Sequence, residues 1–148
     1  MKELVYEPRE AIQEFVATKC PGLSNANDFG PSVVFGWKDG DVLLAGCVLY
    51  NLRNHEGKPI EAEAAIAASS PRWCSKSVLN TIGDVVFNKL GCIRLTARVA
   101  RKNKRARKLV EGVGFTLEGV KKRAYNGRQD LMIYGMLKDK CRWLNGNV

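Results

Sequence analysis

A polar turn without glycine lies near the middle of the sequence, at the start of a helix that could bind an anion. The turn reads RWCSKS, from Arg72 to Ser77, and it opens an amphipathic helix. The first amides of a helix have no partner within the helix, and together with the helix dipole they favour an anion at that end. Serine at positions 75 and 77 can also donate hydrogen bonds there. The alternative is an ordinary strand-to-helix turn with a serine cap.

A strongly basic run follows farther along the chain, from Arg101 to Lys108, and contains Asn103 and Ala106. Asparagine is favoured as a helix N-cap, so Asn103 predicts where a helix begins. The cations could complement the phosphates of a cofactor, engage RNA or DNA, or form a solvated helix face. The sequence leaves these three interpretations open.

The charge distribution indicates which kind of partner the protein binds, and the cysteine content bears on metal binding. Residues 1–70 hold 6 Lys/Arg and 10 Asp/Glu, whereas residues 71–148 hold 18 and 5, within a net charge of +9. The positive second half favours a polyanionic partner, either nucleic acid or a phosphorylated cofactor. Five cysteines without a CxxC pair, together with the lone His55, make a structural zinc site unexpected and fit reduced thiols.

The size of the chain indicates one compact domain spanning residues 1–148, since 148 residues with 45% apolar content can fill one core. The longest apolar run, residues 64–68, is far shorter than the roughly 18 residues of a membrane span. Acidic residues stand near the N-terminus where a signal peptide needs an apolar centre. We therefore expect a cytoplasmic protein with no membrane partner.

The elements that must position these residues can be predicted from periodicity and turn signals. A short apolar start leads to a helix after Pro8, and then come three strands within residues 32–37, 42–50 and 60–69, a helix over 78–90, a strand over 92–99, a helix that stops at Gly114, and a hairpin of residues 115–125 and 130–137. This order predicts an α/β (α+β) layered fold around a mixed sheet.

The turn and the basic run together resemble the coenzyme A site of the GNAT superfamily of acyl-CoA-dependent N-acetyltransferases. In that family a loop of pattern (Q/R)xxGx(G/A) holds the cofactor pyrophosphate, and here Arg72, Ser75 and Ser77 stand at the patterned positions. The downstream family element is matched by Asn103, Ala106, Gly114-Phe115 and Glu118-Gly119. The likeness covers nearly the whole chain. Within the superfamily, the chain resembles small phage and prophage forms related to ribosomal-protein N-terminal acetyltransferases.

The resemblance implies a GNAT-like mixed, mostly antiparallel seven-stranded sheet with helices on both faces. It also implies an enzyme, an acyl-CoA-dependent N-acyltransferase that uses acetyl-CoA as co-substrate and transfers acetyl directly to a primary amine. Backbone N–H groups near residues 67–69 would polarise the carbonyl. The implied cofactor-binding residues are Ala67, Ala68, Ser69, Arg72, Trp73, Cys74, Ser75, Lys76, Ser77, Asn103 and Ala106. A phage-encoded protein would act in the host cytoplasm.

Within that mechanism, Glu61 and Glu63 are the candidates for the general base. They share one face of the strand that leads to the cofactor loop and could act through water, although exposed edge-strand acids are the alternative. Many family members place a tyrosine as general acid where this chain has Val110. We therefore expect Tyr134, Tyr125 or water to protonate the departing thiolate.

The acceptor is left open by the sequence, and a protein N-terminus, a small amine and a nucleic acid or tRNA all qualify. The alternative function is an acetyltransferase-fold protein that acts on or binds nucleic acid through its basic second half. Such a protein would modify a nucleobase or an aminoacyl-tRNA, or serve as a non-catalytic binding module. The closing segment with Cys141 and Trp143 predicts either an anchor for the C-terminus or a subunit contact in a homodimer.

Overall fold

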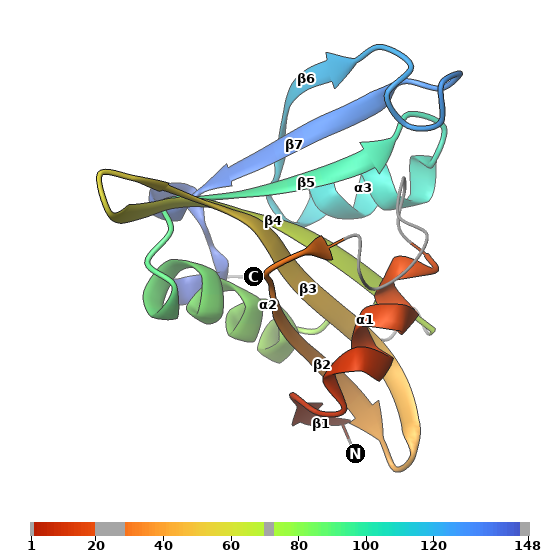
Figure 1. Cartoon of the computed structure of the whole chain (residues 1–148), viewed down its shortest axis with the longest axis vertical. Coiled ribbons are helices and arrows are strands. Elements are labelled where there is room, and N and C mark those ends of the chain that lie inside the picture. The colour runs from red at the N-terminus through yellow and green to blue at the C-terminus, as the bar shows by residue number, and fades with distance from the viewer. Residues whose placement is uncertain (1, 20–28, 70–72, 146–148) are drawn as a thin grey trace.

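The helices and strands follow the chain in the predicted order (Figure 1). The structure is a computed structural model that describes residues 2–19, 29–69 and 73–145. The strands are β1 (Lys2–Val5), β2 (Val33–Asp39), β3 (Val42–His55), β4 (Lys58–Ala68), β5 (Arg94–Ala100), β6 (Thr116–Lys121) and β7 (Leu131–Leu137). The helices are α1 (Arg9–Ala17), α2 (Lys76–Gly83), which continues as a π-helical segment (Asp84–Lys89), and α3 (Lys104–Val113), with short 3-10 turns at Lys138–Lys140 and Trp143–Asn145.

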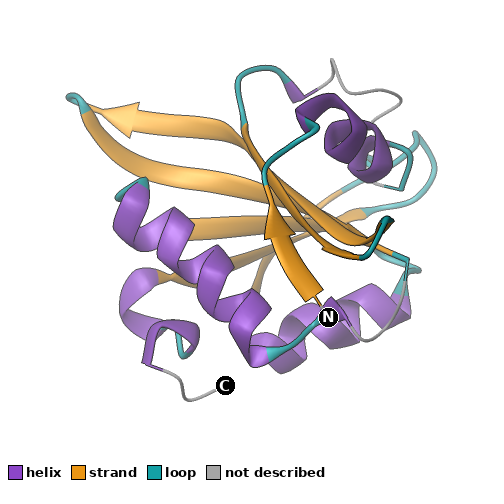
Figure 2. Ribbon diagram, turned by 90° about the horizontal axis from the view of Figure 1, so that it is seen from below, coloured by secondary structure: helices purple, strands orange, loops and turns teal. Residues whose placement is uncertain are grey.

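One sheet contains all seven of these strands, in the order β1-β2-β3-β4-β5-β7-β6. Only β4 and β5 run parallel, and the other neighbours are antiparallel. Helices cover both faces of the sheet (Figure 2). The predicted mixed, mostly antiparallel seven-stranded sheet is therefore confirmed.

Helix α1 covers one face and packs on β2, β3 and β4. Its Ile12 and Val16 are buried against the strands. Gly46 makes this close approach feasible, because a Cβ at that position would lie only 2.9 Å from Val16 Cγ2. The glycine in the middle of β3 therefore allows α1 to pack closely on the sheet.

The opposite face is covered by α2, the π-helical segment, α3 and the end of the chain. Trp143 is buried in this core, and its Nε1 donates a hydrogen bond to the Val113 carbonyl at 2.9 Å. Its ring meets Phe115 edge-on at 5.9 Å between centroids, and Cys141 is also buried. The closing segment therefore anchors the end of the described chain, which was one of the two predictions for it.

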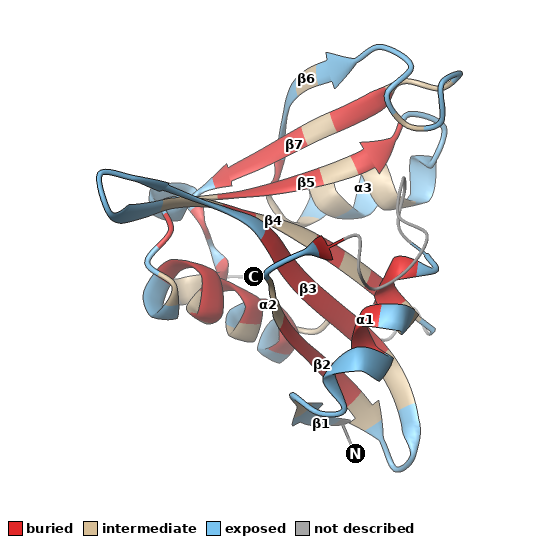
Figure 3. Ribbon diagram, viewed as in Figure 1, coloured by how far each residue is buried: buried red, intermediate tan, exposed pale blue. Residues whose placement is uncertain are grey.

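The β3–β4 hairpin is longer than predicted. Both strands extend past the main body of the sheet, where they are exposed (Figure 3). A two-residue turn joins them, with positive φ angles of 50° at Glu56 and 78° at Gly57. Such a turn matches the twist of antiparallel strands, so residues 54–59, which were expected as a loop, belong largely to the hairpin.

Helix α3 begins and ends as expected. The Asn103 side chain accepts a hydrogen bond from the Ala106 N–H at 3.1 Å, which makes it the N-cap. Gly114 ends the helix with a φ of 118°, a left-handed conformation that favours glycine. No described helix has the length and apolar composition that crossing a membrane requires.

Candidate active site

The candidate site lies where two neighbouring strands separate. β4 and β5 pair from Glu61 opposite Arg94 to Ala64 opposite Ala97. Beyond that pair, β4 continues to Ala68 and β5 continues past Ala97, and the two strands diverge (Figure 1). The sheet therefore opens between them.

The backbone of β4 presents polar groups to this gap. The Ser69 N–H donates to the Leu44 carbonyl of β3 at 2.8 Å. Because alternate residues of a strand direct their N–H and C=O groups to opposite edges, Ala67 also faces β3, whereas Ala68 and Ile66 face the gap. Of the backbone donors expected near residues 67–69, only the Ala68 N–H has the required direction, and Ile66 supplies a second.

A cavity of about 230 Å³ occupies the gap. Its wall includes Tyr50 and Ala65 from the core on the α1 side, and Ile66, Ala97 and Val110 from the core on the other side. The cavity therefore reaches both faces of the sheet. Its wall is completed largely by apolar side chains, among them Ala64, Ala68, Trp73, Leu79, Ile82, Leu95, Val99, Leu109, Val113 and Phe115.

A groove of about 730 Å³ shares part of this wall and extends along α3. Its lining also includes Arg105 and Lys108, from the first turns of that helix. The start of α2 lies next to Trp73 and Cys74, which border the groove, and Ser75 caps it by accepting a hydrogen bond from the Val78 N–H at 3.4 Å. An elongated ligand with an anionic end would fit this arrangement.

Most of the predicted cofactor-binding residues come together here. Ala68, Trp73, Cys74, Asn103 and Ala106 border both the cavity and the groove, and Ala67 and Ser69 border the groove. Ser75 is the cap of α2, and Lys76 and Ser77 form its first turn, outside the lining of either space. Arg72 lies outside the described residues.

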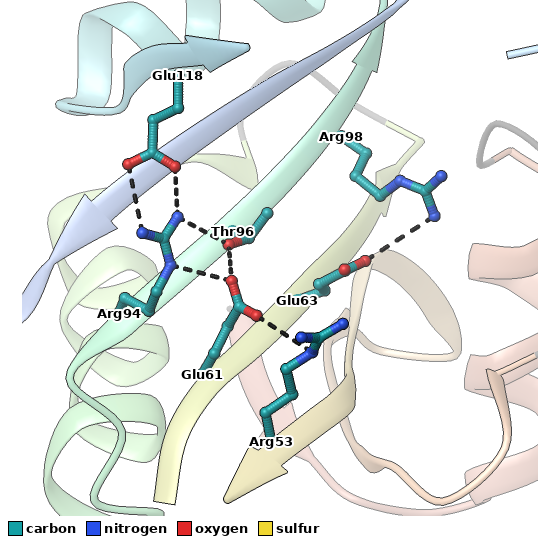
Figure 4. A network of polar contacts seen from close by, with 7 residues as sticks. All are labelled: Arg53, Glu61, Glu63, Arg94, Thr96, Arg98 and Glu118. Atoms are coloured by element: carbon teal, nitrogen blue, oxygen red, sulfur yellow. Dashed lines mark hydrogen bonds and ion pairs between the residues drawn. The ribbon is translucent and has the colours of Figure 1, made fainter. Parts of the chain in front are cut away.

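The carboxylate of Glu61 is already saturated with donors (Figure 4). Its Oε2 accepts from Arg94 Nε at 2.9 Å and from Thr96 Oγ1 at 2.6 Å, and its Oε1 lies 3.7 Å from Arg53 Nε. Arg94 also pairs with Glu118, and this contact is the main cause that raises the Arg94 pKa. Glu61 thus belongs to a clip that joins β4, β5 and β6, and both of its carboxylate oxygens already have partners within the protein.

Glu63 has a different environment on the same face. Among the described residues, its buried Oε2 has no hydrogen-bond partner, and Arg98 Nη1 lies 3.9 Å away. The Tyr50 hydroxyl interacts with both side chains. Burial, and next the charge of Glu63, raise the pKa of Tyr50 to about 12. Tyr50 therefore stays protonated at neutral pH and links Glu63 to the cavity wall.

Tyr134 lies away from the gap. Its buried hydroxyl donates to Glu111 Oε2 at 2.6 Å and accepts from Arg107 Nε at 3.1 Å. Burial, followed by the bond to Glu111, raises the pKa of Tyr134. Tyr134 borders neither the cavity nor the groove, and its contacts tie β7 to α3.

Three polar residues of the cavity wall were missed by sequence reasoning, namely Lys19, Tyr50 and Arg98. Lys19 and Arg98 are the charged side chains of the described wall, and no carboxylate borders the cavity there. Alternation along the strands could have placed Tyr50 and Arg98 on one face. Their meeting depends on strand pairings that no local pattern specifies. Within the described residues, no group of His, Cys, Asp or Glu could hold a metal ion.

The fold is similar to those of solved N-acetyltransferases. Variant forms of the spermidine/spermine N-acetyltransferase SpeG from Vibrio cholerae match with a TM-score of 0.72 at 20% identity, over 98% of this chain and 98% of that chain. The ribosomal-protein-S18-alanine N-acetyltransferase from Escherichia coli matches with a TM-score of 0.67 at 18% identity, over 93% and 94%. Mycobacterium smegmatis RimJ, in complex with CoA-disulfide, matches with a TM-score of 0.63 at 17% identity, over 79% and 59%. No family model and no curated protein matches the sequence.

Proposed function

We propose that this chain is an N-acyltransferase that moves an acetyl group from acetyl-CoA directly to a primary amine. One observation carries the proposal: an apolar cavity lies where β4 and β5 separate, and it reaches both faces of the sheet. Two substrates could therefore approach from opposite faces and meet in the gap. The shared fold with N-acetyltransferases supports the same reaction class.

The residues present fit a coenzyme A thioester. The groove along α3 offers Arg105 and Lys108 to phosphate oxygens, and the first amides of α2 offer further donors. Asn103 and Ala106 line the passage from the groove to the cavity, where an extended arm with amide groups would lie. Asn103 can line the passage and cap α3 at the same time.

The backbone of β4 would stabilise the charge that develops during transfer. Acetyl-CoA supplies the thioester, whose C–S bond breaks as the C–N bond forms and the thiolate leaves. The N–H groups of Ile66 and Ala68 face the gap and can donate to the carbonyl oxygen as it becomes negative. Their position is fixed by the pairing of β4 with β3, so little reorganisation is needed at that moment.

The acceptor amine must be neutral and must lose one proton. Glu63 is the better base of the two candidates, because Glu61 is bound by Arg94 and Thr96. Glu63 does not border the cavity itself, so the proton would pass through a water molecule or along the Tyr50 hydroxyl. The positive charges of Lys19 and Arg98 favour the neutral form of a nearby amine. The thiolate would be protonated by water.

A second candidate function is contact with nucleic acid, and a specific surface favours it. The loop between β6 and β7 approaches the start of α3, since the Lys102 N–H donates to Gln129 Oε1 at 2.6 Å. Cations of this surface that border neither the cavity nor the groove are Arg101, Lys102, Lys121, Lys122, Arg123 and Arg128. Arg101 and Lys122 share Asp130 as an ion-pair partner, at 3.0 and 3.5 Å. All six cations lie outside the coenzyme A groove, and binding of a polyanion to them would weaken steeply with salt.

The proposed function is tested by incubating the protein with isotopically labelled acetyl-CoA and a mixture of cellular amines. Mass spectrometry should find labelled acetyl on at least one amine, and the released thiol should match it in amount. The control omits the protein. Neither labelled product nor released thiol above that control would remove the proposed function.

A further inference from the structure

The acceptor side of the cavity is cationic, and this constrains which amine can bind. The inference below rests on the proposed function. Besides Asn103, the described wall carries the polar side chains of Lys19, Tyr50 and Arg98, and the Glu63 carboxylate contacts Tyr50 and Arg98 without bordering the cavity. A polycationic acceptor would meet two like charges here and no carboxylate on the part of the wall that the structure describes.

Arg98 is placed to bind a ligand. It is the first residue of β5 after the last pair with β4, Ala64 opposite Ala97. Its guanidinium lies apart from the cluster around Glu61 (Figure 4), and its side chain is 34% exposed. The 3.9 Å separation from Glu63 is too long for a hydrogen bond.

Within the described part of the chain, most N–H donors of Arg98 have no hydrogen-bond acceptor. Its contacts there are the ion pair with Glu63 and an interaction with the Tyr50 hydroxyl. A guanidinium carries five N–H donors in a planar fork that matches a carboxylate or phosphate. Two or more donors can therefore reach an acid group that enters the cavity.

We propose that the acceptor is a primary amine that carries a carboxylate or phosphate a few bonds from its nitrogen, and that Arg98 binds this acid group. Arg98, Tyr50 and Glu63 are in mutual contact, so an acid held on Arg98 places its amine beside the Tyr50–Glu63 pair only when the two groups are close in the molecule. An α-amino acid or an aminoalkyl phosphate meets this condition. Polyamines lack the acid group, and the first residue of a protein has an amide in its place.

Matched pairs of acceptors test the proposal. The common L-amino acids are compared with their α-carboxamides, O-phosphoethanolamine is compared with ethanolamine, and spermidine is added alone. Binding to the protein with bound coenzyme A is measured by calorimetry, and turnover is measured by thiol release from acetyl-CoA. At least one acid-bearing amine should bind about tenfold more tightly than its partner without the acid group. The pair that responds also tells carboxylate from phosphate.

Substitution of Arg98 provides the second arm. Arg98→Gln should abolish the preference for the acid-bearing partner, mainly through a higher KM, and Arg98→Lys should keep part of it because the charge remains without the fork. Lys138→Gln, which removes an exposed cation that borders neither the cavity nor the groove, is the control and should keep the preference in full. If the glutamine variant fails to fold, the comparison of acid-bearing amines with their matched compounds on the unaltered protein still tests the proposal.

The outcomes separate this inference from the proposed function. Arg98-dependent binding of an acid-bearing amine without any thiol release would support the inference and count against acetyl transfer. Thiol release that is equal for acids and their amides, or greatest for spermidine, would support transfer and overturn the inference. No difference in binding between any acid-bearing amine and its partner would overturn it as well.

Discussion

The carboxylate of Glu63 and the guanidinium of Arg98 lie 3.9 Å apart, on neighbouring parallel strands at the level where those strands stop pairing. Glu63 precedes the last paired residue of β4, and Arg98 follows the last paired residue of β5. The end of strand pairing thus creates the cavity and also brings a half-buried acid and a cation to its edge. The electrostatics of the candidate site depend on this pair and on Tyr50, which lies on β3 directly opposite Glu63.

Tyr50 should make the stability of the folded protein depend on pH under alkaline conditions. Its pKa is raised from 10.0 to about 12 in the folded state, so between these values the folded protein keeps a proton that the unfolded chain loses. Stability is therefore unaffected below about pH 10 and falls progressively as pH rises from there through about 12, by about 2–3 kcal/mol in all.

Urea unfolding at about pH 9 and about pH 11.5 checks this by comparing the unaltered protein with Tyr50→Phe. The unaltered protein should lose more stability between the two conditions, because the phenylalanine variant lacks the titrating group. Equal losses in both proteins would show that Tyr50 titrates normally.

Glu63→Gln should lower kcat by about 100-fold, because the proton path from the amine ends on this carboxylate. Glu61→Gln should instead lower stability by about 1–3 kcal/mol, because Arg94 and Thr96 lose a charged partner, and it should leave kcat nearly unchanged. Steady-state kinetics and urea unfolding of both variants separate the two roles. The assignment would be reversed by a large fall of kcat in the Glu61 variant alone.

Tyr134→Phe tests whether that hydroxyl takes part in the reaction. The structure gives it two hydrogen bonds, to Glu111 and Arg107, so its removal should cost about 1–2 kcal/mol of stability. Turnover should persist, since Tyr134 borders neither the cavity nor the groove. A fall of about 100-fold in kcat with unchanged cofactor binding would instead assign Tyr134 as the proton donor.

Trp143 should carry much of the stability of the α2–α3 side. Trp143→Ala should cost about 3–5 kcal/mol, because a large buried ring is removed. Trp143→Phe should cost less, about 1–2 kcal/mol, because mainly the hydrogen bond to the Val113 carbonyl is lost. Val42→Ala, at a position that is 58% exposed, is the control and should cost under about 0.5 kcal/mol. Urea unfolding gives all three values, and a small cost for the alanine variant would contradict the anchoring role.

The fold was largely predictable because its local signals agree with one another. Hydrophobic periods of two and of three to four residues marked the strands and helices, Asn103 marked the start of α3, and Gly114 marked its end. The boundaries of the β3–β4 hairpin were wrong because its tip is exposed on both faces. Strand pairing there continues without the apolar alternation on which the prediction relied.

The candidate site was predictable only in part. Ala68 and Asn103 lie at the end of a strand and at the start of a helix, and local sequence patterns can predict such positions. The polar half of the site depends on partners far apart in the sequence, such as Tyr50, Glu63 and Arg98. Which of two nearby glutamates is saturated depends on cross-strand contacts of Glu61 with Arg94 and Thr96, which the sequence does not encode locally.

The central claim is that the cavity and groove between β4 and α3 bind acetyl-CoA, and calorimetric titration of acetyl-CoA tests it most directly. Ala106, which borders both spaces, is replaced by tryptophan (Ala106→Trp), and the exposed Ala124 on the β6–β7 loop is replaced likewise as the matched control. The unaltered protein and Ala124→Trp should bind one equivalent with similar affinity, and Ala106→Trp should bind at least about 100-fold more weakly because the bulky ring fills the passage. Equal affinity in all three proteins, or no binding to the unaltered protein at saturating concentration, would contradict the account.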